Sequence, residues 1–287
     1  MKKNRTKGER YHEKKKVITL IAAALAFTMT GCGSSTASAV SELTAESKPA
    51  TQYTIDANQE VYALLDFEDT AEFENATKGL LASPDTLDIC DENGKVVWSQ
   101  KAYAFLDQDA PDTANPSLWR DTQLNHIYGL FEVTDGIYQV RGYDMSNVTF
   151  IKGDTGWIVV DPLMSVECAQ AALALVEENL GTFPVKAVIY SHSHVDHFGG
   201  VKGIVSEEEV QAGNVQVIAP EGFEKHAVSE NIYAGTAMGR RASYQYGTML
   251  EGGETGSLSI GIGMGQSKGS TSYISPTLEI TQTGEKH

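Results

Sequence analysis

The chain has 287 residues, of which 41% are hydrophobic and 21% are charged, and its formal net charge is −16. That length is sufficient for one large domain or two small domains with a buried core. The composition excludes wholesale disorder, collagen and a polytopic membrane protein. The acidic balance makes nucleic acid an unfavourable partner, so we expect none.

The basic residues are concentrated at the N-terminus. Residues 1–16 contain eight Lys or Arg and two Glu, and residues 17–30 are uncharged and mostly apolar. This apolar run is short for a membrane span, which needs ~20 residues. A basic segment, an apolar run and then the small residues of Gly31-Cys32-Gly33 are typical of a secretory signal.

Met29-Thr30-Gly31-Cys32 resembles the lipobox of bacterial lipoproteins. We therefore expect residues 1–32 to be a lipoprotein signal peptide, with Cys32 as the lipidated residue. The protein would then be exported and tethered to the bacterial membrane, at the cell surface or in the periplasm. A plain transmembrane anchor and a signal cleaved elsewhere are the alternatives.

Residues 33–55 are Ser, Thr, Ala and Glu without periodicity, which predicts a flexible tether before a domain at 56–287. In that domain, residues 56–84 have the apolar spacing of one or two short helices. Asn93-Gly94 lies between two strand-like segments and predicts a hairpin at 87–98. Residues 107–117 contain two prolines and are expected to be irregular.

From Leu130 onward the pattern becomes that of a sheet with helical connections. Apolar residues at 3–4 spacing predict a helix at 166–180, with Ser165 as its N-cap and Gly181 as its C-cap. A short helix is expected at 223–229. The expected strands are 130–133, 137–140, 148–151, 156–160, 185–190, 215–218 and 277–281. This order predicts a layered α/β fold with a site at the C-terminal edge of the strands.

The three cysteines are Cys32, Cys90 and Cys168. With Cys32 lipidated, the other two are far apart in sequence and do not have the spacing of metal ligands. A disulfide between Cys90 and Cys168 and two isolated, largely buried thiols are the alternatives, of which the thiols are the simpler interpretation.

The sequence has its densest cluster of possible metal ligands at Ser191–His197, SHSHVDH, which we call the histidine loop. Imidazoles and carboxylates are ligands for zinc and similar ions. His192 and His194 alternate in an extended stretch and so can bind one ion. Asp196 and His197 follow a bend and are placed for a second, and two ions sharing a hydroxide suit hydrolysis. A polar surface loop is the alternative.

Asp161 ends the strand expected next to the histidine loop, just before Pro162. A carboxylate there can orient a ligand histidine without itself binding the metal. The alternative is an aspartate that only marks the entry to the following helix.

His192-Ser193-His194-Val195-Asp196-His197 matches the His-x-His-x-Asp-His motif of the metallo-β-lactamase superfamily. Further stretches resemble its alkyl sulfatase family, from about residue 50 to the end of the chain. They are Asn115–Arg120, Gly129–Val133, Tyr138–Gly142, Ser191–Gly203, Ala234–Tyr244 and Gly284-Glu285. The resemblance implies an αβ/βα sandwich, incomplete at the C-terminus, with residues 56–125 as a family-specific extension.

The resemblance also implies two zinc ions and hydrolysis of alkyl sulfate esters such as dodecyl sulfate. His192 and His194 would bind one zinc, and Asp196 and His197 would bind the second. Asp196 is also our candidate catalytic residue. Arg240 and Arg241 are candidates for binding the sulfate, with a salt bridge inside a helix as the alternative.

Members of that family are longer than this chain. The part that follows carries two glutamates and a histidine that complete the zinc sites, a homodimerisation domain and a lipid-carrier-like domain. We therefore expect this chain alone to have impaired activity. The alternatives are a non-catalytic fragment that binds at most one metal and a hydrolase of the same fold that acts on other esters.

Overall fold

A computed structural model describes residues 48–284 of the chain. The expected signal peptide with Cys32, and most of the expected tether, lie outside these residues. In chain order the helices are α2 (Gln52–Leu64), α3 (Ala71–Thr77), η1 (Lys101–Asp107), α4 (Pro116–Asn125), α5 (Val166–Leu180), η2 (Val195–His197), η3 (Val201–Gly203), α6 (Glu207–Gln211), α7 (Phe223–Val228), η4 (Ser229–Tyr233) and α8 (Gly235–Tyr246). The strands are β1 (Leu80–Ala82), β2 (Asp88–Cys90), β3 (Val96–Ser99), β4 (Gly129–Thr134), β5 (Ile137–Arg141), β6 (Val148–Lys152), β7 (Trp157–Val160), β8 (Val185–Ile189), β9 (Gln216–Pro220) and β10 (Leu278–Ile280).

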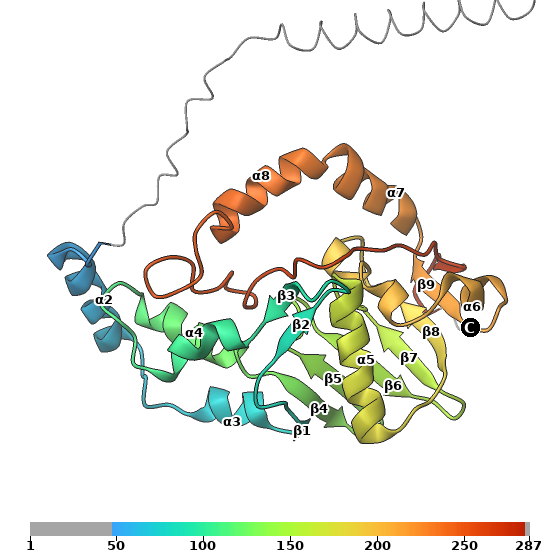
Figure 1. The fold of residues 1–287 in the computed structure, drawn as a ribbon, viewed down its shortest axis with the longest axis horizontal. Helices are drawn as coiled ribbons and strands as arrows, with labels where there is room; N and C mark the ends of the chain where they lie inside the picture. Colours follow the sequence, from blue (N-terminus) through green and yellow to red (C-terminus); the bar gives the residue numbers. More distant parts are fainter. Residues whose placement is uncertain (1–47, 285–287) are drawn as a thin grey trace, which may run out of the picture. The chain divides into compact units, whose positions relative to one another are not determined.

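Eight of these strands form one mixed sheet in the order β1-β4-β5-β6-β7-β8-β9-β10 (Figure 1). The pairs from β1 to β7 are antiparallel, and those from β7 to β10 are parallel. The change falls where α5 connects β7 to its parallel neighbour β8, since parallel neighbours need such a crossover. The α/β class expected from the order of the elements is therefore confirmed.

One face of the sheet is buried and the other is only partly covered. Val148, Phe150 and Val159 are fully buried, and they pack in one core with Ala172 and Val176 of α5. Figure 1 shows α5 crossing this face. The intervening residues of β6 and β7 are half-buried, as alternation along a strand requires. Gln139 of β5 and Thr149 of β6 lie opposite each other on this second face.

The hairpin and the α5 helix follow local sequence signals. β2 and β3 pair as expected, with Gly94 at φ 79° in the turn. α5 has the expected bounds, and Gly181 ends it at φ 92°. Ser165 does not cap α5 with its side chain; its hydroxyl accepts a hydrogen bond from the Ser267 hydroxyl instead, at 2.9 Å. The predicted helix boundaries thus hold even though the capping contact differs.

Three helices differ from the expectation. α2 begins at Gln52, inside the expected tether, because the Thr51 hydroxyl accepts a hydrogen bond from the Thr54 N–H. α4 lies in and beyond a segment expected to be irregular. Its N-cap Asn115 accepts from the Ser117 N–H at 2.9 Å, with Pro116 at the first helical position. α8 was not predicted, because Gly235 and Gly239 lower the helical propensity of its sequence.

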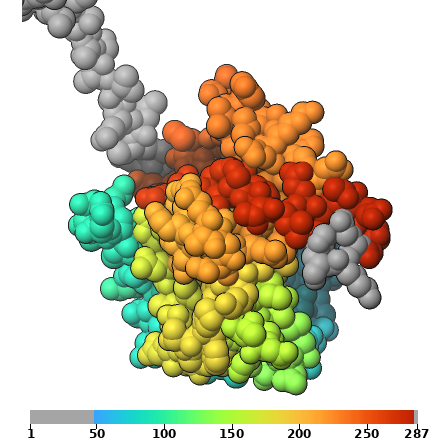
Figure 2. Space-filling model, turned by 90° about the vertical axis from the view of Figure 1, so that its right-hand side faces the viewer, coloured from blue at the N-terminus to red at the C-terminus, as the bar shows by residue number. Residues whose placement is uncertain are grey.

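Residues 264–280 form an extended strap across the domain. The Ser272 N–H donates to Gly199 O at 2.6 Å, and the Val166 N–H donates to Ser270 O at 2.8 Å. Figure 2 shows this last part of the chain, in red, between the orange and the yellow segments. The strap therefore ties the start of α5 to the residues that follow the histidine loop.

Cys90 and Cys168 are both free in the structure. Cys168 is buried, as expected of a core thiol, whereas Cys90 is exposed on β2. None of the helices within residues 48–284 is long and apolar enough to cross a membrane.

Candidate metal centre

A strained turn at the end of β7 places Asp161 at the site. Asp161 has φ 55° and Leu163 has φ 62°, a left-handed backbone that costs a non-glycine residue about 1–2 kcal/mol. The Leu163 N–H donates to Asp161 O at 2.8 Å around Pro162, which closes the turn. Complete burial of the Leu163 side chain and a bond from the Gly200 N–H to Leu163 O hold it in place.

Glycines after the histidine loop allow the loop to sit against the start of α5. A Cβ added to Gly200 would approach Pro162 O, Ser165 O and the Ala169 side chain to under 3.0 Å. Gly199 is equally close to Met164 O. Only glycine fits such an approach of two backbones. These glycines therefore fix the position of the loop relative to Asp161.

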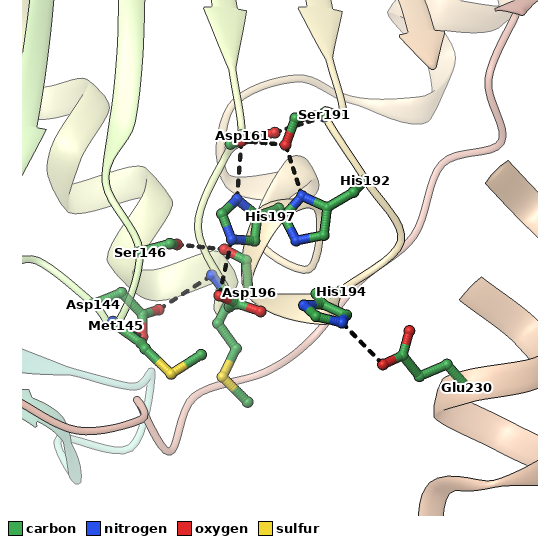
Figure 3. A network of polar contacts seen from close by, with 11 residues as sticks. Asp144, Met145, Ser146, Asp161, Ser191, His192, His194, Asp196, His197 and Glu230 are labelled. Carbon is green, nitrogen blue, oxygen red and sulfur yellow. Dashed lines mark hydrogen bonds and ion pairs between the residues drawn. The ribbon is translucent and has the colours of Figure 1, made fainter. Parts of the chain in front are cut away.

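Asp161 binds both ends of the histidine loop (Figure 3). Its Oδ1 accepts from the Ser191 N–H at 2.8 Å, and its Oδ2 accepts from the Ser191 hydroxyl at 2.6 Å. The same Oδ2 lies 2.9 Å from His197 Nδ1. The expected contact of Asp161 with a loop histidine is thus present, while its role toward a bound metal stays a prediction.

His197 lies between two carboxylates. Its Nδ1 contacts Asp161, and its Nε2 lies 3.1 Å from Asp196 Oδ2. Burial by itself lowers the pKa of His197, but the hydrogen bonds to Asp161 and Asp196 outweigh burial and raise its pKa to about 9. Burial likewise raises the pKa of each aspartate, and the bonds from His197 reverse that effect and lower both. Without a metal, His197 is therefore a cation at neutral pH.

His192 is packed among the other loop histidines. Its Nδ1 is 2.9 Å from the Ser191 hydroxyl, and its ring centroid is 4.1 Å from that of His197 and 4.7 Å from that of His194. Burial and the neighbouring His197 and His194 lower the pKa of His192. His192 is therefore held in the neutral form that binds metals.

His194 lies on the outer side of the loop and pairs with a residue that sequence reasoning missed. Its Nε2 is 3.1 Å from Glu230 Oε1, on the η4 turn. The Ser193 hydroxyl donates to Glu230 at 3.4 Å, and Asn231 Nδ2 donates to Ser193 O, also at 3.4 Å. No local sequence pattern marks this pair, because 36 residues separate its members.

Asp144 supports the loop from the β5–β6 connection. Its carboxylate accepts from the N–H groups of Met145, Met164 and Ser165, and from both the N–H and the hydroxyl of Ser267. Two residues later, the Ser146 hydroxyl donates to Asp196 O. The buried carboxylate thus fixes the segment that fixes Asp196, a role that no motif indicated.

The donors of the loop fit a metal in kind. On His192 and His197 the Nδ1 atoms bond outward to Ser191 and Asp161, which leaves each Nε2 facing the interior of the site. Within residues 48–284, however, no group of three or more His, Cys, Asp or Glu side chains is arranged to hold an ion. His197 Nε2 and Asp196 Oδ2 lie 3.1 Å apart, so both could contact one ion once the proton between them has left.

The two candidate arginines on α8 are placed differently. Both are exposed. Arg241 lines a cavity of about 420 Å³ together with His194, Asp196 and Glu230, whereas Arg240 is not among the residues that line it. The structure therefore brings Arg241, but not Arg240, to the side of the histidine loop.

Comparisons with known proteins agree with this geometry. A family model of the metallo-beta-lactamase superfamily matches residues 141–273. A linear primary-alkylsulfatase of Pseudomonas sp. is 50% identical over 242 residues, which are 84% of this chain and 36% of that protein. An (R)-specific secondary-alkylsulfatase of Pseudomonas sp. is 48% identical over 84% of this chain and 37% of its own length.

A solved structure extends the likeness to the fold. The stereoselective inverting sec-alkylsulfatase Pisa1 from Pseudomonas sp. is 48% identical and superposes with a TM-score of 0.80, over 84% of this chain and 38% of its own. The chain thus spans a little over a third of the length of the relatives that it matches. Over the part that it covers, the chain is a close homologue of alkylsulfatases and carries a metallo-β-lactamase superfamily domain.

Proposed function

We propose that this chain carries the metal-binding loop of an enzyme that hydrolyses alkyl sulfate esters to an alcohol and sulfate. The observation that carries the proposal is the cluster of His192, His194, Asp196 and His197 at the sheet edge, in a chain that is 48–50% identical to alkylsulfatases over 84% of its length. Those relatives' names specify the sulfate ester, and this favours alkyl sulfates over other esters.

Zinc is the ion that we propose for the loop, because three imidazoles and a carboxylate are its usual ligands. His192 and His194 would hold one ion, and Asp196 and His197 a second. The chemistry that zinc would supply there is a pKa of bound water lowered toward ~7 and stabilisation of negative charge on the sulfate oxygens.

The chain's own residues prepare the site. Asp161 fixes the ring of His197 through Nδ1, and Ser191 does the same for His192. Asp161 also balances the positive charge that His197 carries without a metal, and an ion bound at Nε2 would displace the proton on that atom. The cavity beside His194 is lined by Met145, Met238 and Ile262 as well as polar groups, which suits an alkyl chain next to a charged head.

The experiment is to measure sulfate released from dodecyl sulfate by the full purified chain with zinc added. The proposal expects zinc-dependent release that is lost in the His192→Ala and His194→Ala variants. Zinc binding by the loop without any release of sulfate would contradict it.

A non-catalytic metal-binding chain is the second candidate. The observation in its favour is that no group of three or more His, Cys, Asp or Glu side chains within the described part of the chain is arranged to hold an ion. On this account the chain binds at most one zinc, and dodecyl sulfate is left intact. Zinc stoichiometry measured on the same samples separates the two candidates.

We further propose that the protein is exported and anchored through a lipid on Cys32. The basic, apolar and small-residue segments of residues 1–33 support this. In a Cys32→Ser variant expressed in a bacterial host, the protein should move from the membrane fraction to the soluble exported fraction. Retention of this variant in the membrane would show another anchor.

A further inference from the structure

We propose that Arg141, at the end of β5, binds the sulfate group of the substrate. The inference rests on the proposed function and adds a residue to it, outside the histidine loop and outside α8. Arg141 is half-buried and lines a cavity of about 480 Å³.

The guanidinium of Arg141 is only partly used by the described residues. Its Nε donates to Gln139 Oε1 at 2.7 Å, and its carbon lies 4.3 Å from the centre of the Phe131 ring. Within residues 48–284, no hydrogen bond of its two terminal nitrogens and no ion pair to it is found. Arginine stays charged at any relevant pH, so a half-buried guanidinium without a paired anion destabilises the folded state. An anion that binds there would offset this cost.

The acidic residues that line the same cavity are already engaged. Asp144 accepts hydrogen bonds from three main-chain N–H groups of its surroundings and from Ser267. Glu72 pairs with Arg120 at 3.3 Å. Burial, with no charged neighbour adding to it, lowers the pKa of Arg141. Neither of these carboxylates therefore forms an ion pair with Arg141.

Arg141 points from the same sheet edge as the histidine loop. β5 and β7 run in the same direction, because each is antiparallel to β6, so Arg141 and Asp161 follow or end strands at one edge. Gln139, Thr149 and Val160 lie opposite one another in register and share a face, on which Arg141 also lies. Two strand spacings separate β5 from β7, about 10 Å.

A row of polar groups joins the guanidinium to the loop. Gln139 accepts from Arg141 and donates to Thr149 at 3.2 Å, which fixes the amide and hence the guanidinium. Gln139 and Thr149 also line the cavity that contains Asp161, Asp196 and His197. That cavity and the cavity of Arg141 share Met145, Asn147 and Ile262. The two cavities therefore share part of their lining, which places Arg141 beside the cavity of the histidine loop.

Arg141 fits this task better than the arginines on α8. Arg240 and Arg241 are exposed, and an exposed cation recovers little free energy from binding an anion in water. Arg141 is partly desolvated and held by Gln139 and Phe131, so its planar fork is ordered before an anion arrives.

The test is calorimetric binding of hexanesulfonate, which carries the charged group but lacks the bond that a sulfatase hydrolyses. The probe is titrated into the full chain, with 1-hexanol as the uncharged comparison. The Arg141→Gln variant should bind the sulfonate about 10- to 100-fold more weakly, since charge-assisted hydrogen bonds contribute 1.5–3 kcal/mol. Its binding of hexanol should not change. Arg141→Lys, which keeps the charge but loses the fork, should be intermediate.

Gln139→Glu guards against a folding defect in the first variant. It leaves Arg141 in place and puts a carboxylate on its guanidinium, so sulfonate affinity should fall about tenfold. Lys152→Gln, an exposed lysine on β6, is the charge-matched control and should bind as the unaltered chain does. Folding of each variant is checked by circular dichroism.

No sulfonate binding by the unaltered chain, or equal affinity in Arg141→Gln, overturns the inference. The proposed function fails separately. Sulfonate binding that depends on Arg141 without any sulfate release refutes only the hydrolysis. If sulfate is released but sulfonate affinity does not depend on Arg141, only the inference about Arg141 is refuted.

Discussion

The two sides of the histidine loop are held by very different surroundings. On one side, His197 is 24% exposed and lies between Asp161 and Asp196, whose side chains are 14% and 13% exposed. On the other, His194 is 57% exposed, packs against the ring of His192 and pairs with Glu230 of η4. The His197 side is built into the sheet edge, whereas the His194 side is held by a contact at the surface.

The difference in burial between His197 and His194 indicates which part of the site is preformed. The turn at Asp161, the glycines at 199 and 200 and the buried Asp144 all act on the His197 side. Donors that packing and hydrogen bonds fix are preorganised for an ion, whereas exposed donors are not. We expect the His197 side to set the position of the ion and the His194 side to close on it.

The largest expected effect is that of Gly200→Ala. The added Cβ would collide with Pro162 O and the Ala169 side chain, so the free energy of unfolding should fall by at least about 3 kcal/mol. Gly239→Ala on α8 is the matched control. Nothing lies within 4 Å of its Cβ position, and a helix gains up to ~1 kcal/mol from this change. The free energy of unfolding of both variants is measured by urea denaturation. Equal values for the two would contradict the rigid placement of the loop.

The next effect is that of Asp161→Asn, measured without zinc. A neutral amide loses the charged bond to His197 and one bond to Ser191, so the chain should lose about 2 kcal/mol. NMR titration of the His197 ring should show its pKa falling from about 9 toward its ordinary value. An unchanged pKa would mean that Asp161 does not hold His197.

The pH dependence of the zinc-free chain should show the same contact. Because the pKa of His197 is raised in the folded state, its stabilising contribution is complete below the unfolded value of about 6.5 and is lost as pH rises through about 9. Asp161 and Asp196, with lowered pKa values, contribute above about 3.9 and lose their contribution on acidification. Urea midpoints should therefore fall toward pH 9, and this fall should vanish in His197→Gln.

The smallest expected effect is that of Glu230→Gln. The pair with His194 is exposed, so stability should change by less than about 1 kcal/mol. Thermal unfolding measures it, with Glu208→Gln on the exposed face of α6 as the control. A loss as large as that of Asp161→Asn would contradict the contrast between the two sides of the loop.

The sequence predicted the parts of the site that local patterns determine. β7, α5 and β8 follow from strand and helix periodicity and from Pro162 and Gly181, and the histidine loop follows them directly. Contacts between segments that are distant in the sequence could not be predicted from local patterns. Glu230 against His194, Asp144 against Ser267 and the Arg141 guanidinium over the Phe131 ring depend on folding, since no spacing in the sequence encodes them.

Two helices, α4 and α8, were also not predicted from local sequence patterns. For α4, the signal was present, because Asn115-Pro116 is a good helix start, but the prolines favoured an irregular segment. For α8, the signal was weak, since Gly235 and Gly239 lower its helical propensity, although Met238, Ala242 and Tyr246 recur at the spacing of one helix face. The element that brings Arg241 beside the loop was therefore missed.

The measurement that tests the central claim most directly is zinc bound per chain by equilibrium dialysis. The unaltered chain is compared with His192→Ala, His197→Ala and a variant of the isolated His226, His226→Ala. We predict zinc binding by the unaltered chain and by His226→Ala, with affinity reduced at least about tenfold in the two loop variants. Equal zinc binding by all four proteins, or none by the unaltered chain, would contradict the assignment of the histidine loop as the metal centre.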